Sequence, residues 1–248
     1  MSFSSNDTIK KLEKLLPESI HNQSVPKDVL VIIDDYIPKL NDGNIRKIVK
    51  DYLSKDEYLK QQVINNYGTI SNWDVSQVTN MNNLFKSDTN KNYTNFNEDI
   101  SEWNVSNVTN MKNLFQNYTN KNYYSFNEDI SKWNVSNVTD MSSMFAYTRS
   151  FNQPLNNWNV SNVTNMNSMF CYAKSFNQPL NNWNVSNVTN INAMFYNAKS
   201  FNQPLNNWNV SNVTEMYKTF YIYMTRNFNI QENAPWYHGS DNDYLSDY

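Results

Sequence analysis

Six tryptophans recur at nearly constant intervals along this chain of 248 residues, and no other feature constrains the fold as strongly. They are separated by 30, 30, 25, 25 and 25 residues, and each lies in nearly the same phrase. The six residues are Trp73, Trp103, Trp133, Trp158, Trp183 and Trp208. A repeat of this length is typical of an array in which one structural unit is copied and stacked. The sequence therefore predicts a repeat array over about residues 67–220.

The pattern inside one repeat predicts a short strand followed by a short helix. Trp183 and Val185 alternate with asparagines, which is the period of two expected of a strand. Apolar residues then follow at helical spacing over 188–195, and Thr189 is placed to be the helix N-cap. The fold class expected from this pattern is an α/β repeat solenoid with a short parallel strand and a short helix in each 25-residue coil.

A single coil of this kind cannot fold alone, because its few apolar side chains do not offset the conformational entropy of about 25 residues. Stacking buries both flat sides of every coil, and we expect the tryptophans to form a continuous stack. Asparagines on successive coils are expected to form hydrogen-bonded ladders. From this reasoning, Trp158→Ala should unfold a large part of the array, whereas Trp236→Ala should be mild.

Residues 1–66 lack the repeat, and their apolar residues have helical spacing. This segment predicts a small helical bundle that caps the first repeat, whose apolar end would otherwise be exposed. In the fourth helix, Ser54 and Glu57 fit a capping box, and Gly68 is suited to end the helix. The helices are expected near 9–16, 24–37, 45–53 and 54–66. The tail 221–248 breaks the repeat pattern, and we expect it to cap the far end.

Composition excludes several classes of protein. A net charge of −3 is not typical of a nucleic-acid binder. No stretch is long and apolar enough for a membrane span, and residues 1–16 lack the apolar core of a signal peptide. The single cysteine, Cys171, excludes an internal disulfide and fits a reducing compartment. These features predict an intracellular protein without a membrane span or a nucleic-acid partner.

The residues needed for catalysis or metal binding do not occur in a recognisable arrangement. The two histidines, His21 and His238, lie outside the repeats, and no His or Cys pair has zinc-ligand spacing. The pairs Glu98-Asp99 and Glu128-Asp129 fit either solvated return loops, which we favour, or an acidic ladder that attracts a cation. We therefore expect no cofactor, no metal and no enzymatic activity.

The repeat unit resembles a known family. Its phrase Leu155-x-x-Trp158-x-Val160 is similar to the strand signature of leucine-rich repeats, and six copies of the unit over about 68–220 resemble the BspA-like leucine-rich-repeat family. That family was first described in mycoplasma lipoproteins and is abundant in giant viruses of protists. The resemblance implies a right-handed solenoid used for binding, in a giant virus or protist. Val163 occupies the position where ordinary leucine-rich repeats have their ladder asparagine.

A second resemblance lies upstream of the repeats. The segment that begins Val25-Pro26-Lys27 looks like the start of an F-box, which docks on the adaptor of a ubiquitin ligase. A proline followed by an amphipathic helix is also produced by any small helical bundle, and simple capping is the interpretation we favour. The residues that would dock are Pro26, Leu30, Ile33, Tyr36 and Ile37.

These observations predict a non-enzymatic protein-protein interaction scaffold, with a monomer favoured over an oligomer. Two alternatives stay open: an F-box substrate adaptor, and a structural or surface component of a virion or cell. By analogy with the concave face of leucine-rich repeats, the predicted contact residues flank each tryptophan. They are Asp74, Asn104, Asn134, Asn159, Asn184 and Asn209 after it, and Asn72, Glu102, Lys132, Asn157, Asn182 and Asn207 before it. Because the first two intervals are longer, a specific site is first expected between Phe85 and Tyr124.

Overall fold

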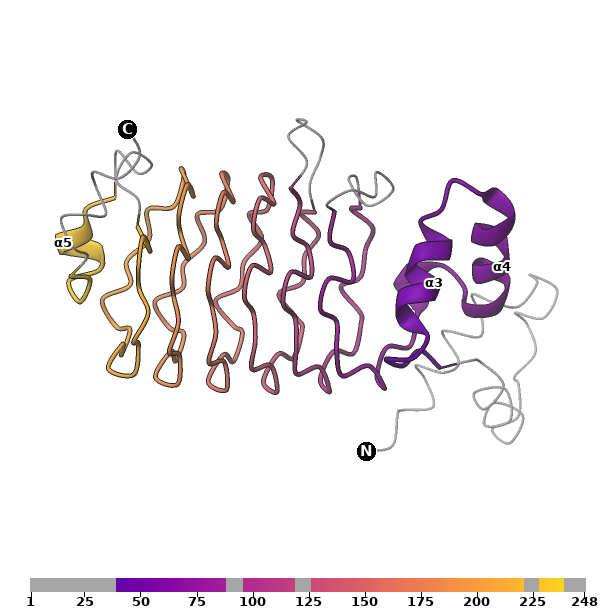
Figure 1. Cartoon of the computed structure of the whole chain (residues 1–248), viewed down its shortest axis with the longest axis horizontal. Helices are drawn as coiled ribbons and strands as arrows, with labels where there is room; N and C mark the ends of the chain where they lie inside the picture. The colour runs from indigo at the N-terminus through magenta and orange to yellow at the C-terminus, as the bar shows by residue number, and fades with distance from the viewer. Residues whose placement is uncertain (1–38, 88–95, 119–125, 221–227, 239–248) are drawn as a thin grey trace, which may run out of the picture.

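The computed structural model describes residues 39–87, 96–118, 126–220 and 228–238 and shows a row of stacked coils with a helical cap at each end (Figure 1). Helices α3 (Ile45–Tyr52) and α4 (Glu57–Tyr67) lie at the N-terminal end, followed by the single turn η2 (Ile70–Asn72). The short helix α5 (Ile230–Asn233) lies at the other end. The helices expected near 9–16 and 24–37 lie outside the described residues.

The predicted α/β solenoid is wrong, because apart from the single turn η2 the described coils contain neither a strand nor a helix. Successive coils are joined instead by isolated parallel bridges, one of them at the same position of every coil. This series runs Asn80↔Asn110, Asn110↔Asp140, Asp140↔Asn165, Asn165↔Asn190 and Asn190↔Glu215. The repeat array is therefore a stack of turns tied together at a few points.

The expected helix over 188–195 does not form because its N–H groups donate to the next coil. Ile191, Ala193 and Phe195 donate to the carbonyls of Glu215, Tyr217 and Thr219, at 2.8, 2.8 and 3.0 Å. The intervening Met194 instead closes a tight turn by donating to Ile191. Ala193 has a φ of 52°, in the left-handed region, which interrupts any run of helical residues.

The expected strand is also replaced by turns. The backbone N–H of Trp183 donates to the carbonyl of Leu180 at 3.0 Å, and that of Val188 donates to Val185 at 2.9 Å. Two tight turns therefore occupy the segment where a short strand was expected. Thr189 does not cap a helix either, since its N–H and its hydroxyl both donate to the carbonyl of Thr164 in the preceding coil.

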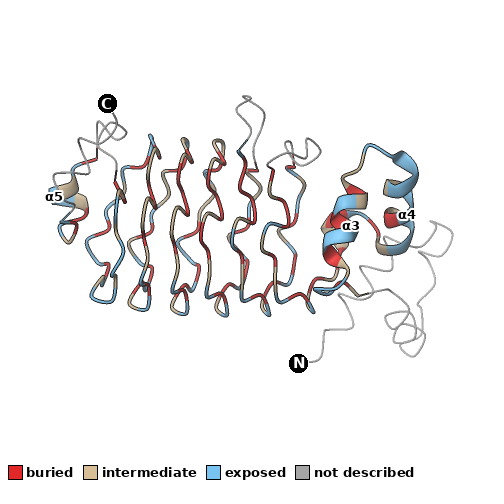
Figure 2. Ribbon diagram, in the orientation of Figure 1, coloured by how far each residue is buried: buried red, intermediate tan, exposed pale blue. Residues whose placement is uncertain are grey.

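Two columns of phenylalanine rings run through the core, one ring of each column per coil. Neighbouring rings within a column lie 5.5–6.2 Å apart, and the paired rings of one coil lie 3.8–4.9 Å apart. The first column consists of Phe85, Phe115, Phe145, Phe170, Phe195 and Phe220. The second column consists of Phe96, Phe126, Phe151, Phe176, Phe201 and Phe228. They belong to one continuous cluster of buried residues from Leu40 to Tyr237, with buried residues in every coil (Figure 2).

Each tryptophan from Trp103 to Trp208 joins two coils by packing and by one hydrogen bond. Its ring lies against a phenylalanine of the first column, as Trp158 does against Phe145 at 6.3 Å. Its indole N–H donates to a backbone carbonyl of the preceding coil, as Trp158 does to Ile130 at 3.1 Å. The same donation recurs from Trp103, Trp133, Trp183 and Trp208 at 2.8–3.0 Å. The repeat therefore requires a large apolar ring that also carries a donor.

The expected asparagine ladders are confirmed. One asparagine side chain per coil donates to a serine carbonyl of the preceding coil, as Asn187 does to Ser161 at 2.7 Å. The full set is Asn107, Asn137, Asn162, Asn187 and Asn212, at 2.6–2.8 Å. Many of the repeated asparagines thus have a structural role.

The N-terminal helices pack on the first coil through Ile45, Val49 and Tyr52 of α3, which are buried. The predicted capping box of α4 is wrong, because the side chain of Asp56, not Ser54, accepts from the N–H groups at the start of this helix. Gly68 ends α4 at a φ of 73°, as expected of a residue without a Cβ.

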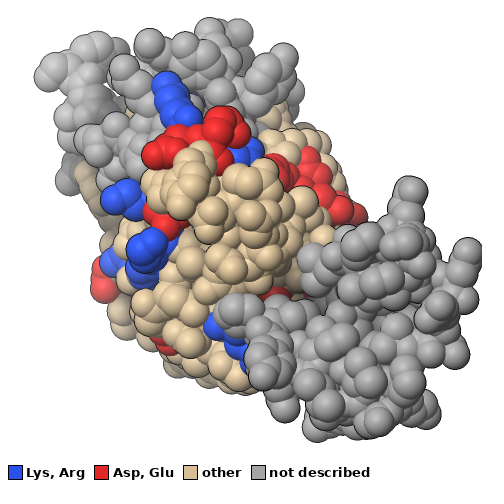
Figure 3. Space-filling model, turned by 90° about the vertical axis from the view of Figure 1, so that its right-hand side faces the viewer, with Lys and Arg blue, Asp and Glu red and all other residues tan. Residues whose placement is uncertain are grey.

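Two charged side chains of this cap satisfy the open edge of the first coil. Asp42 accepts from the N–H groups of Thr79 and Asn80, at 2.9 and 3.0 Å. Arg46 donates to the carbonyl of Asn82 at 2.5 Å and to that of Asn80 at 3.4 Å. Cations and anions are both visible at this end of the molecule (Figure 3). Asp42 and Arg46 thus supply the acceptor and donors that a preceding coil would have supplied.

The C-terminal cap repeats the tryptophan contact outside the regular array. Trp236 stacks on Trp208 at 5.9 Å, and its indole N–H donates to the carbonyl of Leu205 at 2.9 Å. Its side chain is half-buried rather than buried. Trp236 therefore acts as a seventh member of the tryptophan series, which its irregular spacing had concealed.

Trp158→Ala should lower the free energy of unfolding by about 3–5 kcal/mol, because it opens a cavity beside Phe145 and removes the donor to Ile130. Trp236→Ala should cost less, about 1–2 kcal/mol, because that ring is half-buried. Urea unfolding followed by circular dichroism measures both, with Trp158→Phe as a control that keeps an aromatic ring. Equal losses at positions 158 and 236 would contradict this account.

The cap also predicts a pH dependence of stability. Burial raises the pKa of Asp42, but hydrogen bonds from Thr79 and Asn80 and the charge of Arg46 outweigh burial and hold this pKa below its ordinary value of 3.8. Asp42 therefore stabilises the folded state above about pH 4, and this contribution is lost as the pH falls below that value. Urea unfolding at pH 7 and pH 3 should show a smaller acid-induced loss for Asp42→Asn than for the wild type. An equal loss in both would show that Asp42 does not cap the coil.

Candidate functional site

The residues predicted to flank a partner are exposed for the most part, but those after each tryptophan are used by their own turns. The side chain of Asn184 accepts from the N–H of Ser186 at 3.2 Å, and Asp74 accepts from Ser76 at 3.0 Å. Asn104, Asn134, Asn159 and Asn209 make the same turn at 3.1–3.2 Å. No strand face carries them in the described coils, so the analogy behind this prediction does not apply, and their contact with a partner stays a prediction.

Two charged members of that set, Glu102 and Lys132, pair with each other across two coils. Lys132 donates to Glu102 at 3.4 Å, and both side chains are 74% exposed. An exposed pair of this kind contributes little to stability. The predicted F-box residues, Pro26 to Ile37, lie outside the described residues, as does part of the irregular segment between Phe85 and Tyr124.

The acidic pairs are engaged by neighbouring protein groups. Glu98 accepts from the hydroxyl of Tyr52 at 2.7 Å, and Glu128 accepts from the side chain of Asn97. Asp129 accepts from the N–H of Ser131 at 2.9 Å, and this bond lowers its pKa. In the part of the chain that the structure describes, no three His, Cys, Asp or Glu side chains are grouped to hold a metal ion.

A row of tyrosines on one side of the coils is the most distinctive surface feature. Tyr118 lies 4.7 Å from Tyr147, Tyr147 lies 4.6 Å from Tyr172, and Tyr172 lies 5.6 Å from Tyr196, measured between ring centroids. Tyr118 is 47% exposed and the other three are intermediate. We call these four residues the tyrosine row. It places one aromatic side chain on each of four successive coils.

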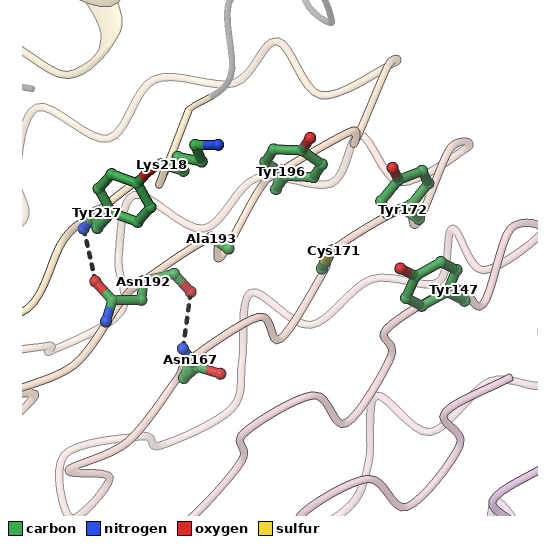
Figure 4. Close-up of a pocket in the computed structure, with 9 residues that line it drawn as sticks. All are labelled: Tyr147, Asn167, Cys171, Tyr172, Asn192, Ala193, Tyr196, Tyr217 and Lys218. Atoms are coloured by element: carbon green, nitrogen blue, oxygen red, sulfur yellow. Dashed lines mark hydrogen bonds between the residues drawn. The ribbon is translucent and has the colours of Figure 1, made fainter. Parts of the chain in front are cut away.

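An open hollow of about 520 Å³ adjoins this row (Figure 4). Three rings of the row, Tyr147, Tyr172 and Tyr196, line it together with Tyr217, which is 55% exposed. Burial raises the pKa of Tyr147, with smaller contributions from Cys171 and neighbouring tyrosines, so its phenol is neutral at physiological pH. The hollow therefore combines neutral aromatic rings and their hydroxyl groups with the cationic side chain of Lys218.

The amide side chains of the hollow are held by hydrogen bonds. Asn167 donates to the carbonyl of Asn192 at 3.3 Å, and Asn192 accepts from the N–H of Tyr217 at 2.6 Å (Figure 4). Asn192 also donates to Glu215 at 2.9 Å. These bonds hold the amide side chains of Asn167 and Asn192 in fixed orientations beside the tyrosines.

Cys171 is among the residues that line the hollow, but it is not arranged as a nucleophile. Its side chain is buried, and burial raises the pKa of the thiol to about 12. Reactive cysteines have a lowered pKa and a neighbouring base or cation. Cys171 is therefore a packing residue.

Three cations follow tyrosines of the row by two or three residues, one on each of three successive coils. They are Arg149, Lys174 and Lys199, which we call the cation stripe. The coils are bonded at this point, since Ser175 donates to the carbonyl of Arg149 at 3.1 Å and Ser200 to that of Lys174 at 3.2 Å. Burial and the charges of Arg149 and Lys199 lower the pKa of Lys174. The stripe therefore runs beside the tyrosine row as a line of like charges.

The tyrosine row and the cation stripe were not predicted from the sequence, although part of their spacing recurs in it. Tyr147 and Tyr172 each follow a core phenylalanine by two residues and precede a cation by two. Tyr196 lies one position earlier in its repeat, so the row is not aligned in sequence. Only the coil geometry brings Tyr118 and Tyr196 into line with the other two.

A search against sequence models of protein families matches the one described as "Mycoplasma protein of unknown function, DUF285" at residues 55–124 and 117–234. These matches span most of the chain and agree with the resemblance to the BspA-like repeat family. No curated protein matches the chain. No solved structure matches it either. Among the helices of the described residues, none has the length and apolar character needed to cross a membrane.

The buried position of Cys171 predicts a slow thiol reaction. In the native protein at pH 8, Ellman's reagent should modify Cys171 at least about tenfold more slowly than in denaturant, because the thiolate is disfavoured and shielded. The release of the thionitrobenzoate anion measures both rates. Rapid modification of the native protein would show an accessible, activated thiol.

Proposed function

This chain belongs to the DUF285 family, whose function is unknown, and we propose that it is a non-enzymatic scaffold that binds a partner protein along the tyrosine row. The observation that carries the proposal is the alignment of four partly exposed tyrosines on successive coils beside an open hollow. Tyrosine is enriched at protein interfaces because its ring supplies apolar contact area and its hydroxyl supplies a hydrogen bond.

The rigidity of the row supports this role. Tyr147 and Tyr172 are stacked with an interplanar angle of 6°, and their backbones are tied to the next coil, Tyr147 to Cys171 and Tyr172 to Tyr196. Side chains that are already ordered lose little conformational entropy on binding. The row is therefore preorganised for a partner.

The residues that flank the tryptophans are weaker candidates, because the side chains of Asn184 and its equivalents close their own turns. The absence of enzymatic activity is part of the proposal, and the buried, unactivated thiol of Cys171 supports it. The F-box adaptor and the structural component of a virion or cell stay predictions, as do the intracellular location and the viral or protist source.

Site-specific photocrosslinking tests the proposal. A photoreactive phenylalanine derivative at Tyr217 should capture one protein from an extract of the source cells, because Tyr217 lines the hollow and is 55% exposed. The same derivative at Tyr58 is the matched control, since that tyrosine is 71% exposed and belongs to α4 of the N-terminal cap (Figure 1). Capture at Tyr58 alone, or equally at both positions, would contradict the proposal.

The captured protein, once purified, should bind the double variant Tyr147→Ala, Tyr172→Ala at least about tenfold more weakly than the wild type, because interface tyrosines carry much of the binding energy. The variant Tyr58→Ala should bind normally, and circular dichroism should confirm that both variants are folded. Unchanged affinity of the folded double variant would exclude the tyrosine row as the binding surface.

A further inference from the structure

We propose that the partner presents an acidic segment, an extended polypeptide rich in Asp and Glu that lies over the cation stripe beside the tyrosine row. This inference rests on the proposed function and adds the chemistry of the partner to it. It places the acidic side chains against Arg149, Lys174 and Lys199, and the remainder of the segment against the row.

The cation stripe is a repeated feature of the array. Its three members occupy equivalent positions of coils that are bonded directly at Arg149 and Lys174, through the N–H groups of Ser175 and Ser200. Adjacent coils that share such bonds lie about 4.8 Å apart, the spacing between hydrogen-bonded extended chains. Three positive charges are thus aligned at short, regular intervals.

This alignment is unfavourable within the protein itself. Among the described residues, none of the three cations forms an ion pair, whereas Lys47 and Lys132 each have an acidic partner. Arg149 and Lys199 both disfavour the charge on Lys174. Glu215 already accepts hydrogen bonds from the side chains of Asn190 and Asn192. An anionic partner would relieve the repulsion along the stripe.

Further cations lie at the two ends of the aromatic surface. Lys86 lies over the ring of Tyr118 at 5.8 Å, and Lys218 lies over that of Tyr217 at 5.4 Å. Positive charge therefore accompanies the aromatic side chains from the second coil to the last, although the chain as a whole carries a net charge of −3. The surface is selective for anions because of local placement and not because of overall charge.

The tyrosine geometry favours a polypeptide over a nucleic acid. Single-stranded nucleic acids bind by stacking bases on exposed aromatic faces. The facing sides of Tyr147 and Tyr172 are covered by each other, at 4.6 Å and 6°. What the row offers instead is ring edges and hydroxyl groups, which suit a polypeptide backbone and its carboxylates.

Fluorescence anisotropy with a labelled peptide of ten glutamates tests the inference on the intact protein. The peptide should bind the wild type, and raising the salt concentration should weaken binding because exposed charges are screened. The triple variant Arg149→Gln, Lys174→Gln, Lys199→Gln should bind at least about tenfold more weakly. A charge-matched control replaces Lys39, Lys50 and Lys55 of the N-terminal cap by Gln and should bind within about twofold of the wild type.

A labelled glycine-serine peptide, a deca-thymidine and a heparin oligosaccharide complete the test. No binding of the glutamate peptide, or equal weakening in both triple variants, would overturn the inference. Tighter binding of deca-thymidine or heparin than of the peptide, lost in the Arg149, Lys174, Lys199 variant, would overturn it in favour of that polymer. Crosslinking at Tyr217 that succeeds while the acidic peptide fails to bind would retain the proposed function and reject only the acidic partner.

Discussion

The structure depends on backbone hydrogen bonds that run between coils rather than along a strand or helix. In each coil, alternate N–H groups over about seven residues donate to carbonyls of the next coil, as Phe170 does to Met194 at 2.9 Å. The N–H groups between them close tight turns. This arrangement satisfies the backbone without any regular secondary structure, and it holds the coils close enough for the phenylalanine columns to stack.

The same arrangement imposes a conformational cost on every coil. Asn83, Asn113, Ser143, Ser168, Ala193 and Lys218 have φ values of 52–57°, although none of them is glycine. Left-handed residues cost roughly 1–2 kcal/mol each. The hydrogen bonds between coils and the buried rings must offset this cost, which explains why the open first coil is closed by Asp42 and Arg46. An array without such a cap would leave both its apolar core and its backbone groups unsatisfied.

Surface chemistry follows from the coil register. Because each coil repeats the one before it, a side chain that recurs in the sequence becomes a line on the surface. The asparagines that follow the tryptophans form lines that serve the turns themselves. The tyrosine row and the cation stripe are two further lines of this kind on the surface. A line of like charges is unfavourable within the protein, and this repulsion is the basis of the proposed anionic partner.

The tryptophan spacing by itself determined that the chain is a stacked array, where it begins and which residues form its core, because a period of about 25 residues leaves no other way to bury Trp158 and its equivalents. It also predicted the asparagine ladders. The spacing could not distinguish a helix from a series of turns, because Val188, Ile191 and Phe195 face the core in either case. Only the tertiary structure decided that the N–H groups of Ile191 and Ala193 bond to the next coil, and this choice excludes the helix. Likewise, the alignment of Tyr118 with Tyr196 depends on how five-residue insertions and one-residue offsets are accommodated between coils, which the linear order of residues does not contain.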